Sequence, residues 1–316
     1  MTYLLFVLGL GFLVAGGDVL IRGALGVANR FGLSPLLAGL VIVGFGTSAP
    51  ELVVSVNAAL SGSPDIAIGN IVGSNIANIL LILGICALIY PISVQPAIVK
   101  RDGIVMLGAT AALVSLSFTG LLIYWHGILF LCALLAYLVY TYKTEKRNVT
   151  LPSAELHRHE AEEVTNLPKR IWVSVVFVAI GLVALIGGAH LLVTSAVEIA
   201  TEFGISETII GLTLVAVGTS LPELSVSVIA AFRRHTDVAL GNILGSNIFN
   251  ILGILGISSL ITDLPINERI VNVDQWVMTG SALLLIAFII SGWRLTRIEG
   301  GIFLSIYVGY TFILLQ

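Results

Sequence analysis

The sequence predicts an all-α polytopic membrane protein with ten transmembrane helices in two inverted five-helix repeats. Three observations lead to this fold class: an apolar composition, ten apolar runs of membrane-spanning length, and a second half that repeats the first. Of the 316 residues, 57% are hydrophobic and 10% are charged, and the mean hydropathy is +1.06. Soluble domains carry about 25% charged residues, so this chain is expected to fold within a lipid bilayer.

The same composition excludes several classes of protein. A water-soluble enzyme with so few charges could not cover its surface with polar groups. A nucleic-acid-binding protein needs a basic face, whereas the formal net charge here is −3. A disordered chain needs a much less hydrophobic composition. We therefore expect contact with lipid and none with nucleic acid, and the sequence indicates no obligate protein partner.

Ten apolar runs are long enough to span the membrane, because a helix needs about 20 residues to cross a hydrocarbon core of about 30 Å. The first run is preceded by no Lys or Arg, so it lacks the basic segment of a secretory signal and is expected to be retained. The predicted spans are 2–21, 34–60, 66–90, 103–120, 122–142, 171–195, 206–231, 238–261, 273–292 and 298–315.

Basic residues predict the orientation of these spans. With the N-terminus outside, 14 of the 15 Lys and Arg residues fall in inside loops, and Arg269 alone falls outside. Short loops on the cytoplasmic side are enriched in Lys and Arg. We therefore predict a multi-pass protein of the plasma (inner) membrane with both termini outside.

One long polar stretch, residues 143–170, is predicted to be a cytoplasmic linker between the two halves. Its His157, His159, Glu160, Glu162 and Glu163 could suggest a metal site, but a solvated linker is the simpler interpretation. The first five-helix repeat then covers 1–142 and the second covers 171–316.

An internal duplication relates the two halves. Residues 39–84 align without a gap on 211–256 at a constant offset of 172, and 29 of these 46 positions are identical. The motif GTSAPELVVSV is matched by GTSLPELSVSV, and GNIVGSNIANIL by GNILGSNIFNIL. Because five spans are an odd number, the second copy enters the membrane from the opposite side. Inverted repeats of this kind place a binding site near the midplane, often at broken helices, and are typical of alternating-access transporters.

Glu51 and Glu223 lie near the middle of their apolar runs and are the strongest candidates for site residues. Carboxylates at this depth are costly and usually mark ion pathways. No Lys or Arg lies in the four repeated spans except at a cytoplasmic end, so the expected partner is a mobile cation or a proton. Pro50 and Pro222 precede the two acids, and a proline within a helix frees a carbonyl group. We therefore expect breaks around Gly46 and Gly218.

Polar side chains surround the two acids at helical spacing. Thr47 lies four residues and Ser48 three residues before Glu51, and the second copy repeats this pattern. The next span carries Asn or Ser at every fourth position, at 70, 74 and 78 and again at 242, 246 and 250. Such stripes can bond helices together, but two copies beside broken acidic helices favour ion ligands. Oxygen donors of this kind suit Ca²⁺ or Na⁺ and argue against Zn²⁺. Glycines 69, 73, 241 and 245 are expected to serve close helix packing.

At these motifs the chain resembles the cation/Ca²⁺ exchanger family, and specifically its prokaryotic sodium/calcium exchangers. The resemblance covers the ten spans, both repeats and the linker, and the GTSxPE and GNxxGSNxxN motifs each occur twice. Proton-coupled relatives carry GNxxE in place of GTSxPE, so the resemblance favours sodium coupling. It implies a secondary active antiporter, not an enzyme, that exchanges Na⁺ for Ca²⁺ by alternating access and normally extrudes Ca²⁺. It implies no cofactor beyond the transported ions.

The resemblance also implies roles for individual residues. Asn78 and Asn250 would line the middle of the site, and spans 2–21 and 171–195 would slide together as a gating pair. The Ca²⁺ site would be formed by Glu51, Glu223, Thr47 and Thr219. Flanking Na⁺ sites would use Ser48, Ser74 and the Gly44 carbonyl on one side, and Ser220, Ser246 and the Ala216 carbonyl on the other.

Some family members carry Asp at the position of Asn250. With Asn there, the pocket holds two acids, so one Ca²⁺ neutralises it and three Na⁺, the number that the resemblance implies, leave it at +1. Exchange would then be electrogenic, and potassium dependence is not expected. The alternatives are a Ca²⁺/H⁺ antiporter of the same fold, a cation channel, and an intramembrane hydrolase for which His190 is the one histidine expected to be buried.

Overall fold

The computed structural model describes residues 2–62, 64–148, 168, 170–202 and 218–314. The regular elements of the described chain are helices, apart from four two-residue strands. In the first half the elements are α1 (Thr2–Phe31), α2 (Pro35–Leu37), η1 (Ala38–Val43), α3 (Gly44–Thr47), α4 (Ala49–Leu60), α5 (Pro64–Ala77), η2 (Asn78–Leu83), α6 (Gly84–Ile89), β1 (Ile92–Ser93), α7 (Pro96–Ile98), η3 (Val99–Gly103), α8 (Ile104–Ser117), β2 (Leu121–Leu122) and α9 (Tyr124–Asn148). In the second half they are α11 (Ile171–Glu202), α14 (Leu221–Phe232), α15 (Thr236–Phe249), η5 (Asn250–Leu255), α16 (Gly256–Ile261), β3 (Leu264–Pro265), η6 (Ile270–Asp274), α17 (Gln275–Gly292), β4 (Arg294–Leu295) and α18 (Arg297–Leu314). The η elements are π-helical turns.

Seven helices of the described chain are long and apolar enough to cross a membrane, or eight if one bent pair counts as a single span. This is the predicted all-helical, polytopic membrane architecture. The expected span 103–120 corresponds to the 14-residue α8, and the expected span 206–231 is described only from residue 218. Ten spans therefore stay a prediction. The first and sixth expected spans are longer than predicted, since α1 continues to Phe31 and α11 to Glu202.

The bent pair is the span that carries Glu51. Its two parts, Pro35–Thr47 and Ala49–Leu60, differ in direction by 40°. Ser48 lies at the break with φ −79° and ψ 9°, whereas Gly46, where we expected the kink, stays within α3. Pro50 is the second residue of α4, where the missing N–H of a proline costs nothing. Ser220 has nearly the same backbone angles before α14, φ −86° and ψ 7°.

Each half of the protein covers the other. Helix α9 packs against α16 and η5 of the second half, and α18 packs against α6 and η2 of the first. Likewise β1 pairs antiparallel with β4, and β2 pairs antiparallel with β3. Each of these contacts in one half thus has a counterpart from the other half.

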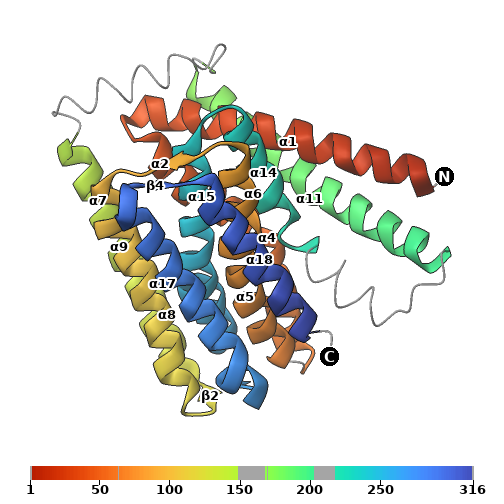
Figure 1. Cartoon of the computed structure of the whole chain (residues 1–316), viewed down its shortest axis with the longest axis vertical. Helices are drawn as coiled ribbons and strands as arrows, with labels where there is room; N and C mark the ends of the chain where they lie inside the picture. The colour runs from red at the N-terminus through yellow and green to blue at the C-terminus, as the bar shows by residue number, and fades with distance from the viewer. Residues whose placement is uncertain (1, 63, 149–167, 169, 203–217, 315–316) are drawn as a thin grey trace.

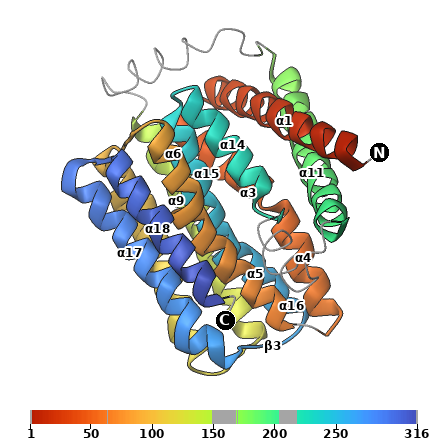
Figure 2. The same cartoon turned by 45° about the vertical axis from the view of Figure 1, so that its right-hand side comes forward.

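Helices α1 and α11 form a pair at one side of the molecule, away from α8, α9, α17 and α18 (Figures 1 and 2). Their seam is lined by glycines. A Cβ added to Gly9 would lie 2.9 Å from the carbonyl oxygen of Gly188, and one added to Gly188 would lie 3.0 Å from the carbonyl oxygen of Gly9. Small residues let membrane helices approach this closely, so the seam depends on the absence of side chains.

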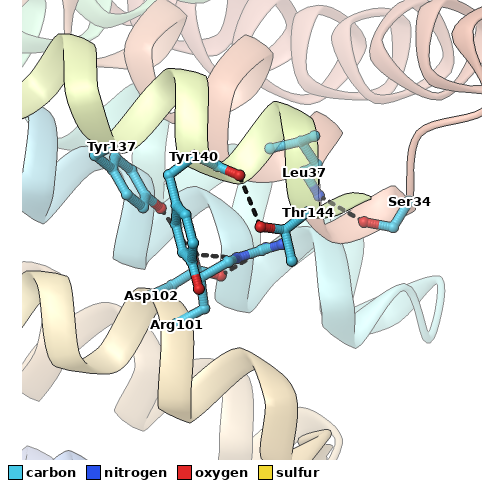
Figure 3. Close-up of polar contacts among 7 residues, drawn as sticks. All are labelled: Ser34, Leu37, Arg101, Asp102, Tyr137, Tyr140 and Thr144. Atoms are coloured by element: carbon cyan, nitrogen blue, oxygen red, sulfur yellow. Dashed lines mark hydrogen bonds and ion pairs between the residues drawn. The ribbon is translucent and has the colours of Figure 1, made fainter. Parts of the chain in front are cut away.

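A buried polar cluster in the first half connects η3 to α9 by hydrogen bonds. The Arg101 guanidinium contacts both Asp102 carboxylate oxygens, Nε to Oδ1 at 2.8 Å and Nη2 to Oδ2 at 2.9 Å. Tyr137 of α9 points to the same carboxylate and donates to Oδ1 at 2.8 Å (Figure 3). In the second half Tyr310 donates to Asp274 at 3.1 Å, and Arg269 lies 3.5 Å from that carboxylate. The second pair is the more exposed one, with 44% of the Arg269 side chain accessible against 9% for Arg101.

Candidate functional site

Two fully buried carboxylates lie where the two halves of the chain meet. Glu51 is 0% and Glu223 is 1% exposed. Each lies in the first turn of its helix, α4 or α14, directly after the break. The positive end of a helix dipole stabilises a negative charge at this position. In the described part of the chain neither carboxylate is paired with Lys or Arg.

Serines at the two breaks connect the halves. Ser48 donates to Glu223 Oε1 at 2.9 Å, and Ser220 donates to Glu51 Oε1 at 3.2 Å. Each acid is therefore bound by the serine of the opposite copy, not by the serine three residues before it. These crossed bonds bring the two acidic helix ends into one site.

The predicted threonines lie beside the acids and are also bonded across the halves. Thr47 donates to Asn242 Oδ1 at 3.1 Å, and Thr219 donates to Asn70 Oδ1 at 3.4 Å. A hydroxyl that donates a hydrogen bond still has oxygen lone pairs for a cation. The threonines are therefore held in place without losing their capacity as ligands.

Asn70 and Asn242 also hold the acidic helices. Asn70 donates to the Glu51 carbonyl at 3.4 Å and to Ser55 Oγ at 3.1 Å. Asn242 donates to the Glu223 carbonyl at 3.3 Å and to Ser227 Oγ at 2.8 Å. These amides fix the first turns of α4 and α14, and so fix the positions of the carboxylates.

Two further serines are bonded to this group of residues. Ser74 accepts from Ser220 at 3.3 Å, and Ser220 also donates to Glu51, whereas the resemblance groups Ser74 with Ser48 and the Gly44 carbonyl. Ser246 donates to the Gly44 carbonyl at 3.0 Å. Each of these groups of hydrogen-bonded residues therefore contains residues from both copies of the repeat. Ala216 lies outside the described residues.

Close approach of two backbones positions the Gly44 carbonyl. A Cβ on Gly44 would lie 2.9 Å from the Asn242 carbonyl oxygen, and one on Gly245 would clash with the Leu40 backbone. Gly241 likewise faces the Leu36 carbonyl. The packing role expected for Gly241 and Gly245 is thus confirmed. A Cβ on Gly69 or Gly73 would meet no atom within 4 Å in the described part of the chain.

Asn78 and Asn250 are buried and begin the π-helical turns η2 and η5. Asn78 Nδ2 donates to Asn247 Oδ1 at 3.0 Å, and Asn250 Nδ2 donates to Asn75 Oδ1 at 3.0 Å. Both amides therefore use their nitrogen for protein contacts. π-Helical turns inside α-helices occur frequently at functional sites.

Four buried oxygen atoms of the site have no hydrogen-bond partner among the residues that the structure describes: Glu51 Oε2, Glu223 Oε2, Asn78 Oδ1 and Asn250 Oδ1. Leaving a buried polar atom unpaired costs about 1–3 kcal/mol, and more for a charged group. All four are hard oxygen acceptors, two from carboxylates and two from amides, which is the ligand chemistry that Ca²⁺ prefers. The site is therefore suited to hold a hard cation.

Sequence reasoning missed several residues that build this site. Ser55, Asn75, Ser227 and Asn247 bond its members, and all four are identical between the copies at the offset of 172. That identity was the available signal. The expectation that His190 is buried was wrong, because its side chain is exposed on α11. This removes the histidine on which the hydrolase alternative depended.

Comparison with known proteins agrees with these features. The family profile described as "Sodium/calcium exchanger protein" matches residues 1–143 and 173–316. The chain is 38% identical to the putative antiporter CaxA of Alkalimonas amylolytica, over 98% of both chains. It is 33% identical to the sodium/calcium exchanger MaX1 of Methanosarcina acetivorans, over 99% of this chain and 98% of that one. Among solved structures, the sodium-calcium exchanger NCX_Mj soaked with zero Na⁺ and Ca²⁺ superposes with a TM-score of 0.83 at 34% identity, over 97% and 96% of the two chains.

The fold and the buried oxygen cage define an integral membrane protein of the ion-exchanger class. The chain belongs to the sodium/calcium exchanger protein family.

Proposed function

We propose that the chain is a secondary active antiporter that exchanges Na⁺ for Ca²⁺ across the membrane by alternating access. The observation that carries this proposal is the set of four buried oxygens without a hydrogen-bond partner in the described chain, two on amides and two on carboxylates that have no basic partner there. Family membership adds the class of reaction, which is transport and not enzymatic catalysis. Under an inward Na⁺ gradient the direction of net transport is Ca²⁺ extrusion.

In this proposal Ca²⁺ binds between Glu51, Glu223, Thr47 and Thr219, with Asn78 and Asn250 lining the middle. The hydrogen bonds support two flanking Na⁺ sites. One uses Ser48, Ser246 and the Gly44 carbonyl beside Glu223. The other uses Ser220 and Ser74 beside Glu51; the Ala216 carbonyl, which the resemblance assigns beside Ser220, lies outside the described residues.

We further propose ten spans in two inverted halves. The reciprocal bonds of Ser48 and Ser220, together with the exchanged strand pairs, support a two-fold relation between the halves. Because each half has an odd number of spans, the two halves cross the membrane in opposite directions, and the two-fold axis then lies in the membrane plane. Both termini then lie outside the plasma membrane and residues 143–170 lie in the cytoplasm, as the 14-to-1 distribution of basic residues favours.

Transport requires the site to open to each side in turn. The pair α1 and α11 is the candidate moving part, because its glycine-lined seam joins the two helices closely to each other. In this proposal the pair slides across the site as one body, while the remaining helices hold the ligands.

The exchange is electrogenic in this scheme. With two acids in the pocket, one Ca²⁺ gives a neutral site and three Na⁺ give a charge of +1. One net charge therefore crosses the membrane in each cycle. Potassium is not required, because Asn250 contributes no third negative charge.

The decisive experiment measures ⁴⁵Ca²⁺ flux in proteoliposomes with Na⁺, K⁺ or H⁺ gradients imposed one at a time. The proposal expects uptake driven by the Na⁺ gradient alone, and loss of that uptake in Glu51→Gln. Flux driven by a pH gradient in sodium-free buffer would favour a Ca²⁺/H⁺ antiporter. Single-channel currents without a counter-ion would favour a cation channel. Retained uptake in Glu51→Gln would refute the site assignment.

A further inference from the structure

Asn75 and Asn247 lie behind the cation site, and each holds an asparagine of the site from the opposite half. Both are nearly inaccessible, at 2% and 1% exposed. Asn75 accepts from Asn250, and Asn247 accepts from Asn78, both at 3.0 Å. The symmetric arrangement makes this a repeated feature of the fold.

The hydrogen bonds of Asn75 have a defined direction. Its Nδ2 donates to the carbonyl oxygen of Asn247 at 3.3 Å and faces Met278 Sδ at 4.0 Å. A carbonyl oxygen and a thioether sulfur accept but do not donate. The Asn75 side chain must therefore keep its nitrogen toward these groups and its oxygen toward Asn250. Asn247 Nδ2 also faces a thioether sulfur, Met106 Sδ at 3.8 Å.

The orientation of the Asn75 amide determines the orientation of the Asn250 amide in the cation site. Since Asn75 offers only an oxygen, Asn250 must turn its nitrogen toward Asn75 and its oxygen away from it. That oxygen is one of the four unpaired acceptors described above. A rotation of the Asn250 amide by half a turn would oppose two oxygen atoms and direct an N–H group at a bound cation.

We propose that Asn75 and Asn247 are positioning residues that fix the amide orientation of Asn250 and Asn78, so that the site presents oxygen and not nitrogen to the transported cation. An asparagine is neutral and can present either atom, so the site needs such a constraint wherever it uses an amide in place of a carboxylate. The inference rests on the proposed function of the site and adds the residues that set its ligand chemistry. Partners that orient ligands in this way are typically worth about 10- to 100-fold in metal affinity.

The test compares Ca²⁺ binding by the purified full-length protein in detergent, measured by titration with CaCl₂ in sodium-free buffer. Asn75→Leu removes the acceptor, frees the Asn250 amide to rotate, and is expected to weaken binding about 10- to 100-fold. Ile76→Leu, a swap of equal volume at the next buried residue of α5, controls for disturbed packing and should change binding less than about twofold.

A rescue variant separates orientation from folding. Asn250→Asp has two equivalent oxygens, so it needs no partner to orient it. Its added negative charge should raise Ca²⁺ affinity in both backgrounds. The proposal expects a larger gain, by about tenfold or more, in the Asn75→Leu background than in the wild type, where the new carboxylate meets the Asn75 oxygen. Equal gains in the two backgrounds, or tight binding by Asn75→Leu alone, would overturn the proposal.

The matched pair Asn247→Leu and Asn78→Asp repeats the test in the other half, with the same outcome expected. Because the measurement is equilibrium binding, its result is distinct from that of the flux assay. A wild-type protein that binds Ca²⁺ but shows no Na⁺-driven flux would refute antiport and leave the positioning role standing.

Discussion

Asp18 of α1 forms an ion pair with Arg233, the residue that directly follows α14, and its other carboxylate oxygen lies 2.9 Å from Nε of Arg22 one turn further along α1. A shift of 172 residues from Asp18 leads to His190, and the same shift back from Arg233 leads to Ser61. The corresponding positions of the other half thus carry neither a carboxylate nor an arginine. Helix α1 is thus attached to the second half by an ion pair that α11 cannot form at the equivalent positions.

Asp18→Asn should weaken the attachment of α1 to the end of α14. A partly exposed ion pair contributes about 0.2–1 kcal/mol, which corresponds to a shift of about 1.5- to 5-fold between the two conformations of an alternating-access cycle. We expect the KM for Ca²⁺ measured from the cytoplasmic side to change by this factor relative to the KM from the outside. The measurement uses vesicles of both orientations. Arg233→Gln should give the same shift and the double variant no more, since both remove the ion pair between α1 and the end of α14, whereas the pair of Asp18 with Arg22 lies within α1; additive shifts would contradict this account.

Ser48→Ala and Ser220→Ala should weaken Ca²⁺ binding to a similar extent. Each removes a hydrogen bond to a buried carboxylate of the opposite half, and a hydrogen bond to a charged group contributes about 1.5–3 kcal/mol. We expect a loss of affinity of about ten- to a hundredfold for each variant, measured by titration with CaCl₂. The matched control is Ser281→Ala, because this buried serine donates only to the Met278 carbonyl of its own helix. A large effect of one serine with none of the other would argue against equivalent halves.

Membrane potential should drive the exchange. If one net charge moves per cycle, 100 mV contributes about 2.3 kcal/mol, or about a 50-fold change in the Ca²⁺ accumulation ratio at equilibrium. Proteoliposomes with fixed Na⁺ gradients and potentials set by K⁺ and valinomycin measure this ratio. A ratio that does not respond to voltage would indicate two Na⁺ per Ca²⁺ and remove the proposed stoichiometry.

Gly245→Ala should destabilise the protein strongly, because the added Cβ would clash with the backbone of Leu40 where α15 crosses η1. Backbone atoms cannot move aside as a flexible side chain can, so we expect a cost typical of overpacking, about 1–3 kcal/mol. Thermal unfolding in detergent measures the effect. Gly280→Ala is the matched control on α17, with no described atom within 4 Å of the new Cβ; an equal loss in both variants would show that helix crossing is not the cause.

Asp102→Asn should cost more stability than Asp274→Asn. The first substitution removes the charge of a fully buried carboxylate that accepts from both Arg101 and Tyr137 (Figure 3), and each hydrogen bond to such a charged group contributes about 1.5–3 kcal/mol. The second removes the more exposed partner of Arg269, for which about 0–1 kcal/mol is expected. Unfolding temperatures of the two variants, compared with the wild type, decide the order. The reverse order would show that exposure does not govern these pairs.

Much of the site could be predicted because its motifs occur twice in the sequence. The repeat at an offset of 172 selects Glu51 and Glu223 and the hydroxyl residues beside them, since selection for packing alone would not preserve acids in apolar helices. Composition and the apolar runs likewise predict a polytopic helical membrane protein, because burial in lipid restricts the chain to helices and closed barrels.

The crossed pairing could not be predicted from the sequence. Helical spacing places Ser48 beside Glu51, but the broken backbone turns its hydroxyl to Glu223. The same exchange places Ser74 with Ser220 and the Gly44 carbonyl with Ser246. The π-helical turns at Asn78 and Asn250 also could not be predicted, because their apolar residues have the pattern of an ordinary α-helix. Contacts between copies depend on tertiary packing, which local spacing does not contain.

The exchanged strands have a mechanical consequence. Strand β1 pairs with β4, and β2 pairs with β3. These backbone hydrogen bonds join loops of the two halves and restrain the helices that the loops connect from moving relative to one another. If transport proceeds as proposed, the helices that carry the ligands are expected to stay fixed, and the motion is expected in elements that these strands do not connect, of which α1 and α11 are the longest in the described chain.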